Sequence, residues 1–129
     1  MIEAGAPMGE SKRAPSAAVA ERVLDLAHLG RMTLGEKRLE AEVLALFDRQ
    51  AGMLLARMRG APATNVAAFA HTIKGSARGI GAWDVAEAAA RVERAAQADG
   101  PGDLAGACKQ LATAVGEVRR AALGLRRGQ

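Results

Sequence analysis

The chain has 129 residues, of which 50% are hydrophobic, 2% aromatic and 25% charged, and its formal net charge is +4. A chain of this length forms one domain around a single core. Strands favour β-branched and aromatic residues, so a composition with no tyrosine, two phenylalanines and one tryptophan argues against a β-sandwich or barrel. Alanine, leucine, glutamate and arginine favour helices, and we therefore predict an all-α protein.

The surplus of positive charge does not by itself predict a nucleic-acid partner. Acidic and basic residues are interspersed along most of the chain, and the one basic cluster is terminal: Arg119, Arg120, Arg126 and Arg127. Cations at a helix C-terminus interact favourably with the helix dipole. We therefore interpret this cluster as a solvated helix end and predict no nucleic-acid partner.

Cysteine usage and hydropathy bear on the compartment. A single cysteine, Cys108, excludes an internal disulfide and fits a reducing environment. The chain has no run of about 18 apolar residues, and Glu3 and Glu10 interrupt any signal-peptide pattern. We predict a cytoplasmic protein with no membrane partner.

The first part of the chain lacks an apolar stripe. Residues 1–17 combine glycine, proline, serine and charges, which predicts a flexible tail before a domain at 18–129. Asp25 is placed to cap a short helix over "LAHLGRM". An earlier start, at Ser16, also keeps apolar residues at helical spacing, so both starts stay open.

The next two helices follow from capping signals. Thr33 and Glu36 have capping-box spacing, which predicts a helix with Thr33 as its N-cap, running to about Arg59. Pro62 is tolerated in the first turn of the following helix, which we expect to end near Arg78. The predicted core stripe of the first of these helices is Leu39, Val43, Leu46, Phe47, Leu54 and Met58.

Two further helices complete the pattern. One extends from Trp83 to about Ala98, and a turn at "DGPGD", 99–103, leads into the last. The apolar residues expected on one side of the earlier helix are Val85, Ala88, Ala89, Val92 and Ala96. The last helix has alternating spacings of four and three at Leu104, Cys108, Leu111, Val115, Val118, Ala122 and Leu125. Cys108 lies on this seam, which indicates a small buried hydrophobe rather than a reactive thiol.

These segments predict an antiparallel up-down four-helix bundle with a short extra N-terminal helix. A closed bundle buries its own seams, so we expect a monomer.

One stretch, "AHTIKGSARGIGA" at residues 70–82, places a histidine on a helix. At about 100° per residue with Val66 at zero, His71 falls near 140°. The predicted core side of the same helix comprises Phe69, Ala70, Ile73 and Ala77, all within about 60° of zero. We therefore predict that the imidazole points away from the core.

The neighbours of His71 indicate what approaches it. Lys74, Gly75 and Arg78 follow at one and two turns, and alanines stand one turn before it. Gly75 costs about 1 kcal/mol relative to alanine inside a helix, a cost explained if something bulky must reach the ring. Lys74 and Arg78 add positive charge. Phosphate suits both a nucleophilic nitrogen and flanking cations.

The same stretch resembles the signature of histidine-containing phosphotransfer (HPt) domains, roughly A-H-x-L-K-G-S/A-x-x-x-I/L/V-G-A, from which Ile73 departs conservatively. The resemblance extends over about residues 24–126 and includes "LDLAHL" and "EVLALF". It implies a carrier in a bacterial-type two-component phosphorelay that shuttles a phosphoryl group between receiver aspartates. No segment supplies the ATP-binding boxes of a kinase, so we expect no ATP-dependent activity.

The resemblance also implies roles. His71 would be the phosphoacceptor, attacking through Nε2, with Lys74 pairing with phosphoryl oxygens and Gly75 giving clearance. Glu93 occupies the position at which several members carry a glutamine or similar residue, and a carboxylate there would accept from Nδ1–H and orient the ring. Two alternatives stay open: Glu93 as a surface partner of Arg91 or Arg94, and Arg78 either near the phosphate or simply solvated.

The implied partners are receiver domains of response regulators and of a hybrid histidine kinase. We predict no bound cofactor, with Mg²⁺ expected on the receiver during transfer. His28 and His71 lie 43 residues apart without ligand spacing, so no metal site is predicted, and His28 is interpreted as an ordinary helix-surface residue. The competing hypothesis is a non-catalytic helical bundle that binds a receiver or another protein without carrying phosphate.

Overall fold

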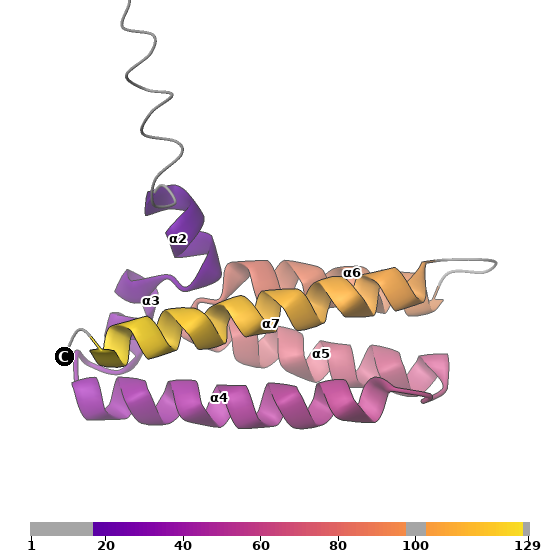
Figure 1. Cartoon of the computed structure of the whole chain (residues 1–129), viewed down its shortest axis with the longest axis horizontal. Coiled ribbons are helices and arrows are strands. Elements are labelled where there is room, and N and C mark those ends of the chain that lie inside the picture. Colours follow the sequence, from indigo (N-terminus) through magenta and orange to yellow (C-terminus); the bar gives the residue numbers. More distant parts are fainter. Residues whose placement is uncertain (1–16, 98–102, 128–129) are drawn as a thin grey trace, which may run out of the picture.

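The computed structural model describes residues 17–97 and 103–127. These residues are helical apart from short connections and contain no strand, which confirms the all-α prediction (Figure 1). The described helices are α2 (Ala17–Val23), α3 (Leu26–Met32), α4 (Lys37–Met58), α5 (Ala63–Ile80), α6 (Trp83–Gln97) and α7 (Leu104–Arg127).

The four long helices, α4 to α7, lie side by side (Figure 1). In the described residues α5 packs between α4 and α6, and α7 contacts both α6 and α4, so the four surround one core. Short connections join α4 to α5 and α5 to α6, so these helices alternate in direction. The short helices α2 and α3 contact the bundle near the passage from α5 to α6. None of the described helices is long and apolar enough to cross a membrane.

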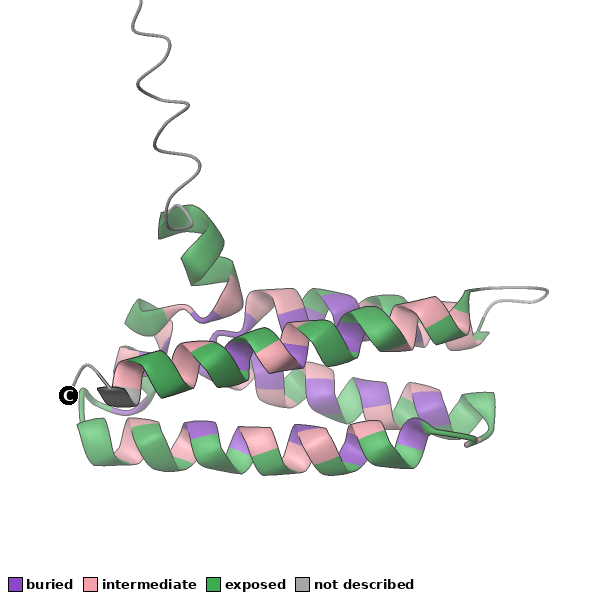
Figure 2. Cartoon of the chain, viewed as in Figure 1, coloured by how far each residue is buried: buried purple, intermediate pink, exposed green. Residues whose placement is uncertain are grey.

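The core is almost entirely aliphatic, and its residues face inward from each long helix (Figure 2). Alanines with no exposed surface, such as Ala70, Ala77 and Ala89, let α5 and α6 approach closely. The larger buried side chains of the long helices are Leu44, Phe47, Leu54, Met58, Val66, Ile73, Ile80, Val85, Val92, Leu111, Val115 and Val118.

The start of α4 differs from the prediction, and the Thr33 capping box is wrong. Glu36 occupies the N-cap position, without a side-chain cap hydrogen bond. Thr33 instead ends α3, where it is buried and its hydroxyl donates to the carbonyl of Leu29 at 2.8 Å. Leu34 and Gly35 then adopt left-handed conformations, with φ of 56° and 75°, which turn the chain between the two helices.

The predicted core stripe of α4 is wrong at Leu46, whose exposed fraction is 59%. Phe47 and Leu54 are buried as predicted, and Leu44 and Ala51 complete the buried side instead. The buried side of α4 is centred near Phe47. Successive residues of a helix are about 100° apart, so Leu46, directly before Phe47, points toward solvent.

The N-terminal junction also corrects the interpretation of His28. The expected cap is present, since the Asp25 carboxylate accepts from the backbone N–H of His28 at 3.1 Å. His28 Nε2 lies 3.0 Å from the carbonyl oxygen of Gly79, and its ring meets Trp83 edge-on with centroids 5.1 Å apart. A carbonyl can only accept, so Nε2 donates. His28 is therefore a half-buried link between α3 and the end of α5, not an ordinary surface residue.

Several boundaries shift. α3 begins after Asp25 as predicted, but a separate helix, α2, precedes it. α5 continues to Ile80, two residues beyond the expected end, and stops at Gly81, whose φ of 83° is left-handed. The predicted tail, 1–17, lies outside the described residues except for Ala17, and the turn at 99–103 does so except for Asp103.

On α7, Leu111, Val115 and Val118 are buried as the spacing predicts, while Cys108 is half-buried. Burial raises the pKa of the Cys108 thiol, as expected for a packed rather than a reactive cysteine. Arg119 donates to Asp48 of α4 at 2.8 Å and Arg120 is exposed, whereas the side chains of Arg126 and Arg127 lie outside the described part.

Candidate functional site

His71 lies in the middle of α5 and points away from the core. Its side chain is 71% exposed, whereas Ala70 and Ile73 beside it are buried at 0% and 1%. The helical phase of the sequence predicts this orientation. The imidazole of His71 is thus exposed to solvent on one side of α5, while the opposite side of the helix is tightly packed.

Glu93 of α6 faces His71 across the seam between the two helices. Its Oε2 lies 2.9 Å from Nδ1 of the imidazole. A carboxylate accepts, so Nδ1 carries the proton and donates it, which leaves the lone pair on Nε2. Nε2 is the nitrogen that remains free to react.

Glu93 also holds Lys74. The Lys74 Nζ lies 2.6 Å from Oε1, and the two side chains are only 18% and 17% exposed. Oε1 is buried from solvent, and its contact with the ammonium is an ion pair rather than a well-aligned hydrogen bond. Lys74 therefore lies against the carboxylate instead of extending into solvent beside the imidazole.

These contacts determine the charge of Glu93. Burial by itself would raise the pKa of the Glu93 carboxyl. The ion pair with Lys74 and the contact with His71 together outweigh burial and hold that pKa below its ordinary value of 4.5. Glu93 is thus an anion throughout the neutral range and presents a fixed negative charge to the imidazole.

Gly75 and Arg78 lie on the same outer side of α5. A Cβ built on Gly75 would meet no atom within 4 Å, so the helix next to His71 is bare backbone open to solvent. Arg78 is exposed, and among the described residues its guanidinium makes no ion pair. Its charge is available at the surface two turns after the histidine.

The helices explain why these residues meet. Lys74 lies one turn after His71 on the flank of α5 that faces α6. Ala89 is fully buried and lies one turn before Glu93 on α6. Glu93 therefore lies at the outer edge of the contact between α5 and α6. The Lys74–Glu93 pair was not predicted from the sequence, although the angular position of Lys74, about 60° from His71 toward α6, is the signal that indicates it.

The alternative partners of Glu93 do not contact it. Arg91 lies 3.7 Å from Glu87 instead, and Arg94 is exposed. Within the residues that the structure describes, no group of three or more histidine, cysteine, aspartate or glutamate side chains is arranged to hold a metal ion.

His71 thus presents Nε2 to solvent, with the Glu93 carboxylate on its other ring nitrogen and the exposed Arg78 two turns further along the same helix. The family model for the Hpt domain matches residues 42–121, a range that includes His71 and Glu93. The chain belongs to the Hpt domain family and is a phosphotransfer module of two-component signalling, a carrier rather than a kinase, of the type that interacts with receiver domains. Comparisons with curated proteins and with solved structures gave no match.

Proposed function

We propose that this protein is the histidine phosphotransfer protein of a bacterial-type phosphorelay and carries the phosphoryl group on Nε2 of His71. The observation that carries this proposal is the contact of Nδ1 with Glu93, which directs the lone pair of Nε2 into solvent. The exposed ring and the bare backbone at Gly75 give a partner access to that nitrogen.

The transfer step follows from this geometry. The Nε2 lone pair attacks the phosphorus of an aspartyl phosphate on a receiver, the N–P bond forms, and the bond from phosphorus to the aspartyl oxygen breaks. The aspartate leaves as a carboxylate, and the proton stays on Nδ1. The ring becomes a phosphorylated imidazolium whose positive charge faces the Glu93 carboxylate, which stabilises it. The reverse step passes the group to a second receiver, since an N–P bond retains high transfer potential.

Cations complete the site. The transition state is loose, with charge spread over the equatorial phosphoryl oxygens, so positioning and positive charge contribute most of the catalysis. Lys74 is within one helical turn of His71 and exchanges its contact with Glu93 for the incoming phosphoryl oxygens. Arg78 adds charge at the same surface. We expect the Mg²⁺ that assists transfer to be bound by the receiver.

We also propose in which form, in which compartment and with which partners the protein acts. The unit that acts is the domain at 18–129, an antiparallel four-helix bundle that works as a cytoplasmic monomer. Its partners are receiver domains of response regulators and of a hybrid histidine kinase. Neither nucleic acid nor membrane takes part.

Incubation with an aspartyl-phosphorylated receiver tests the proposal. The wild type should acquire an acid-labile, base-stable label, and His71→Gln should acquire none. His28→Gln is the matched control, because it removes the other histidine of the chain and should keep the label. No label on the wild type with any receiver of the source organism would contradict the proposal and favour a non-catalytic interaction module.

A further inference from the structure

The Glu93 carboxylate poses a chemical problem for a nucleophilic histidine. Its Oε2 lies 2.9 Å from Nδ1 of His71. A carboxylate at this distance favours the protonated form of an imidazole, and an imidazolium has no lone pair left on Nε2 for attack. A glutamine at this position would orient the ring without adding charge. A nucleophilic His71 therefore requires that the charge of Glu93 be neutralised before the phosphoryl group arrives.

Lys74 meets the same carboxylate from its other oxygen. The Lys74 Nζ lies 2.6 Å from Oε1, so the carboxylate stands between a cation and the imidazole. The two side chains are only 18% and 17% exposed, whereas every other ion pair that the described residues form has a partner more than half exposed. Charges shielded from water interact more strongly, because the effective dielectric constant is lower. Lys74 is thus placed to neutralise much of the charge of Glu93.

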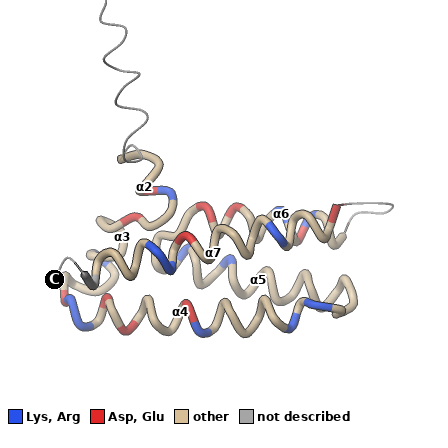
Figure 3. Tube along the Cα trace, viewed as in Figure 1, with Lys and Arg blue, Asp and Glu red and all other residues tan. Residues whose placement is uncertain are grey.

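The other charged residues of α5 and α6 are engaged elsewhere or exposed. On α5, Arg78 is exposed and lies one turn beyond Lys74. Figure 3 shows charges of both signs along α6, but Arg91 of this helix lies 3.7 Å from Glu87 and Arg94 is exposed. Neither helix therefore offers a second cation in contact with the carboxylate.

The remaining helices supply no such cation either. α3 and α4 pack against α5, and α2 and α7 pack against α6. Within the described part of the chain, no hydrogen bond or ion pair joins these four helices to the imidazole or to Glu93. Their cations on the outer surface, such as Arg31, Arg57 and Lys109, are exposed. The electrostatic balance at His71 is therefore set by Glu93 and Lys74.

We propose that Lys74 is a positioning residue of the resting site: by pairing with Oε1 of Glu93 it neutralises the carboxylate, so that the imidazole of His71 stays uncharged and nucleophilic. This inference rests on the proposed function. The resemblance implies only that the lysine meets the phosphoryl group. The role proposed here precedes that step, is exerted through Glu93, and arises because this position carries a carboxylate rather than an amide.

Partner exchange during transfer then makes the same negative charge available to the ring. As the bond from Nε2 to phosphorus forms and the bond from phosphorus to the aspartyl oxygen breaks, the aspartate leaves as a carboxylate and the proton stays on Nδ1. Lys74 moves from Oε1 to the phosphoryl oxygens, which leaves Glu93 facing the phosphorylated imidazolium. One ion pair of the resting site thus becomes two, one at each end of the ring.

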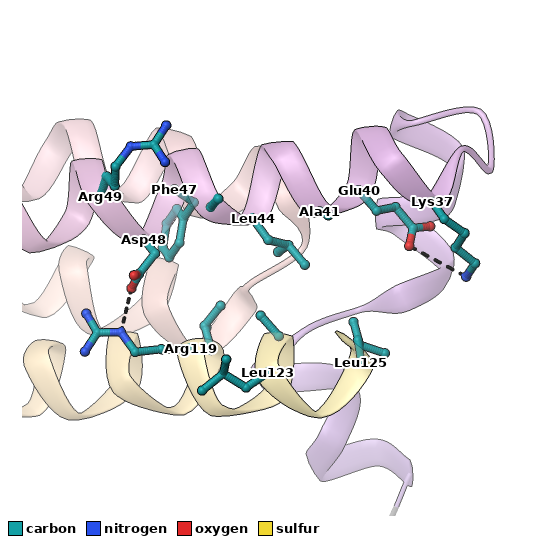
Figure 4. A pocket seen from close by; sticks show the side chains of 13 residues that line it. Lys37, Glu40, Ala41, Leu44, Phe47, Asp48, Arg49, Arg119, Leu123 and Leu125 are labelled. Atoms are coloured by element: carbon teal, nitrogen blue, oxygen red, sulfur yellow. Dashed lines mark hydrogen bonds and ion pairs between the residues drawn. The ribbon is translucent and has the colours of Figure 1, made fainter. Parts of the chain in front are cut away.

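The other lysine–glutamate pair among the described residues provides a matched control. Lys37 lies 3.7 Å from Glu40 on α4, beside a pocket between α4 and α7 (Figure 4). Lys37 is 70% exposed, and an exposed ion pair contributes little. Lys37→Met therefore removes the same charge as Lys74→Met by the same substitution, on a helix that does not carry the site.

The test is the pH dependence of His71 phosphorylation by phosphoramidate, in which the P–N bond of the donor breaks and ammonia leaves, so no receiver is needed. The rate should fall at low pH, where the imidazole takes up a proton. In Lys74→Met this fall should lie about one pH unit higher than in the wild type, because Glu93 is no longer neutralised. Lys37→Met, and Lys74→Arg, which keeps the charge, should both keep the wild-type profile.

A double variant shows whether the lysine acts through the carboxylate. In the Glu93→Gln background, loss of Lys74 should move the fall by no more than about half as much as in the wild-type background. The ¹⁵N chemical shifts of the His71 ring, followed against pH, should show the same displacements without any phosphoryl donor. A lower rate at every pH with no displacement, or equal displacements in both backgrounds, would overturn the proposal.

Failure of this inference differs from failure of the proposed function. Receiver-dependent labelling of His71 together with a wild-type profile in Lys74→Met would overturn the role of Lys74 and leave His71 as the phosphoacceptor. The predicted displacement without labelling by any receiver of the source organism would instead confirm the charge arrangement and overturn the proposed function.

Discussion

The ammonium of Lys74 lies 2.6 Å from Oε1 of Glu93, while the imidazole of His71 contacts the other carboxylate oxygen at 2.9 Å. One carboxylate thus holds both the acceptor ring and the cation expected to meet the phosphoryl group. If His71 is the phosphoacceptor, as we propose, a doubly charged phosphoryl group arriving at Nε2 competes with Glu93 for Lys74. The ion pair with Glu93 therefore keeps the Lys74 ammonium within one helical turn of His71 and largely shielded from solvent.

Replacement of the carboxylate should slow transfer. Glu93→Gln keeps a hydrogen-bond acceptor for Nδ1 but removes the negative charge that, in the proposed mechanism, stabilises the phosphorylated imidazolium. We expect transfer from a phosphorylated receiver to be about 10- to 100-fold slower, as when an orienting carboxylate is removed from a functional histidine. Rapid-quench kinetics measure this rate. A wild-type rate in Glu93→Gln would show that the contact at Nδ1 has no catalytic role.

The same variant should have a pH-dependent stability defect. The pKa of Glu93 is lowered in the folded state. Burial is the largest single effect and would raise this pKa, but the contacts with Lys74 and His71 together outweigh it. A lowered folded pKa contributes stability above the unfolded value, near 4.5, and this contribution is lost as the pH falls through the folded pKa. Glu93→Gln should therefore be less stable than the wild type by about 0.5–1 kcal/mol at pH 7. The difference should shrink below about pH 4.5.

Urea unfolding followed by the fluorescence of Trp83 measures this free energy at each pH. Glu117→Gln on α7 is a suitable control, because Glu117 is exposed and makes no ion pair within the described residues. A difference between Glu93→Gln and the wild type that grows as the pH falls would contradict the assigned direction of the pKa shift.

Removal of the lysine should affect the site more than the fold. Lys74→Met keeps the aliphatic length of the side chain and removes its charge, and we expect transfer about tenfold slower with phosphoramidate labelling also reduced. The pKa of Glu93 should rise relative to the wild type, since one of the interactions that lower it is gone. Carboxyl ¹³C chemical shifts of Glu93 against pH measure this change, and an unchanged titration would show that the ion pair does not persist in solution.

Substitutions of Gly75 should affect the free energy of unfolding and phosphotransfer from a receiver differently. Open space surrounds a Cβ at this position, so Gly75→Ala should raise the free energy of unfolding by about 0.5–1 kcal/mol. Gly75→Leu should remain folded and react with phosphoramidate, but should block transfer from a receiver by steric hindrance. Gly52 of α4 is the matched control, since a Cβ there also meets nothing within 4 Å. Normal receiver transfer in Gly75→Leu would remove the steric argument.

Gly81 is required by the backbone rather than by the site. Its φ is +83°, and a Cβ there would lie 3.1 Å from both the Cβ and the carbonyl oxygen of Asp25. We expect Gly81→Ala to lower the free energy of unfolding by about 1–2 kcal/mol, the cost of a left-handed non-glycine residue, with some further loss from crowding. Chemical denaturation measures this loss. Equal stability of Gly81→Ala and the wild type would contradict the conformation at the end of α5.

The long helices and the direction of His71 follow from the sequence because periodicity determines which side of a helix is buried. Leu46 shows where this reasoning fails: its spacing from Val43 and Phe47 fits a helix side, but only packing against α5 and α7 selects the centre of the buried arc. Thr33 fails for a related reason. A hydroxyl three residues before a glutamate fits a capping box, yet burial at the end of α3 gave it a different partner.

Contacts between elements distant in sequence were the least predictable. The sequence of its own helix predicts that His28 is a surface residue. Only the position of α3 against the end of α5 brings its Nε2 to the carbonyl of Gly79. Glu93 could be placed near the imidazole from the family resemblance alone. That the same carboxylate also holds Lys74 depends on the angle between α5 and α6, which no local pattern specifies.

The most direct test of the central claim is ³¹P NMR of the phosphorylated protein during transfer. We predict a single resonance of Nε2-phosphohistidine after reaction with a phosphorylated receiver, absent from His71→Gln. On addition of fresh unphosphorylated receiver this resonance should decay while aspartyl phosphate appears. A resonance of Nδ1-phosphohistidine, or a phosphohistidine resonance that persists while the receiver gains no phosphate, would contradict the account.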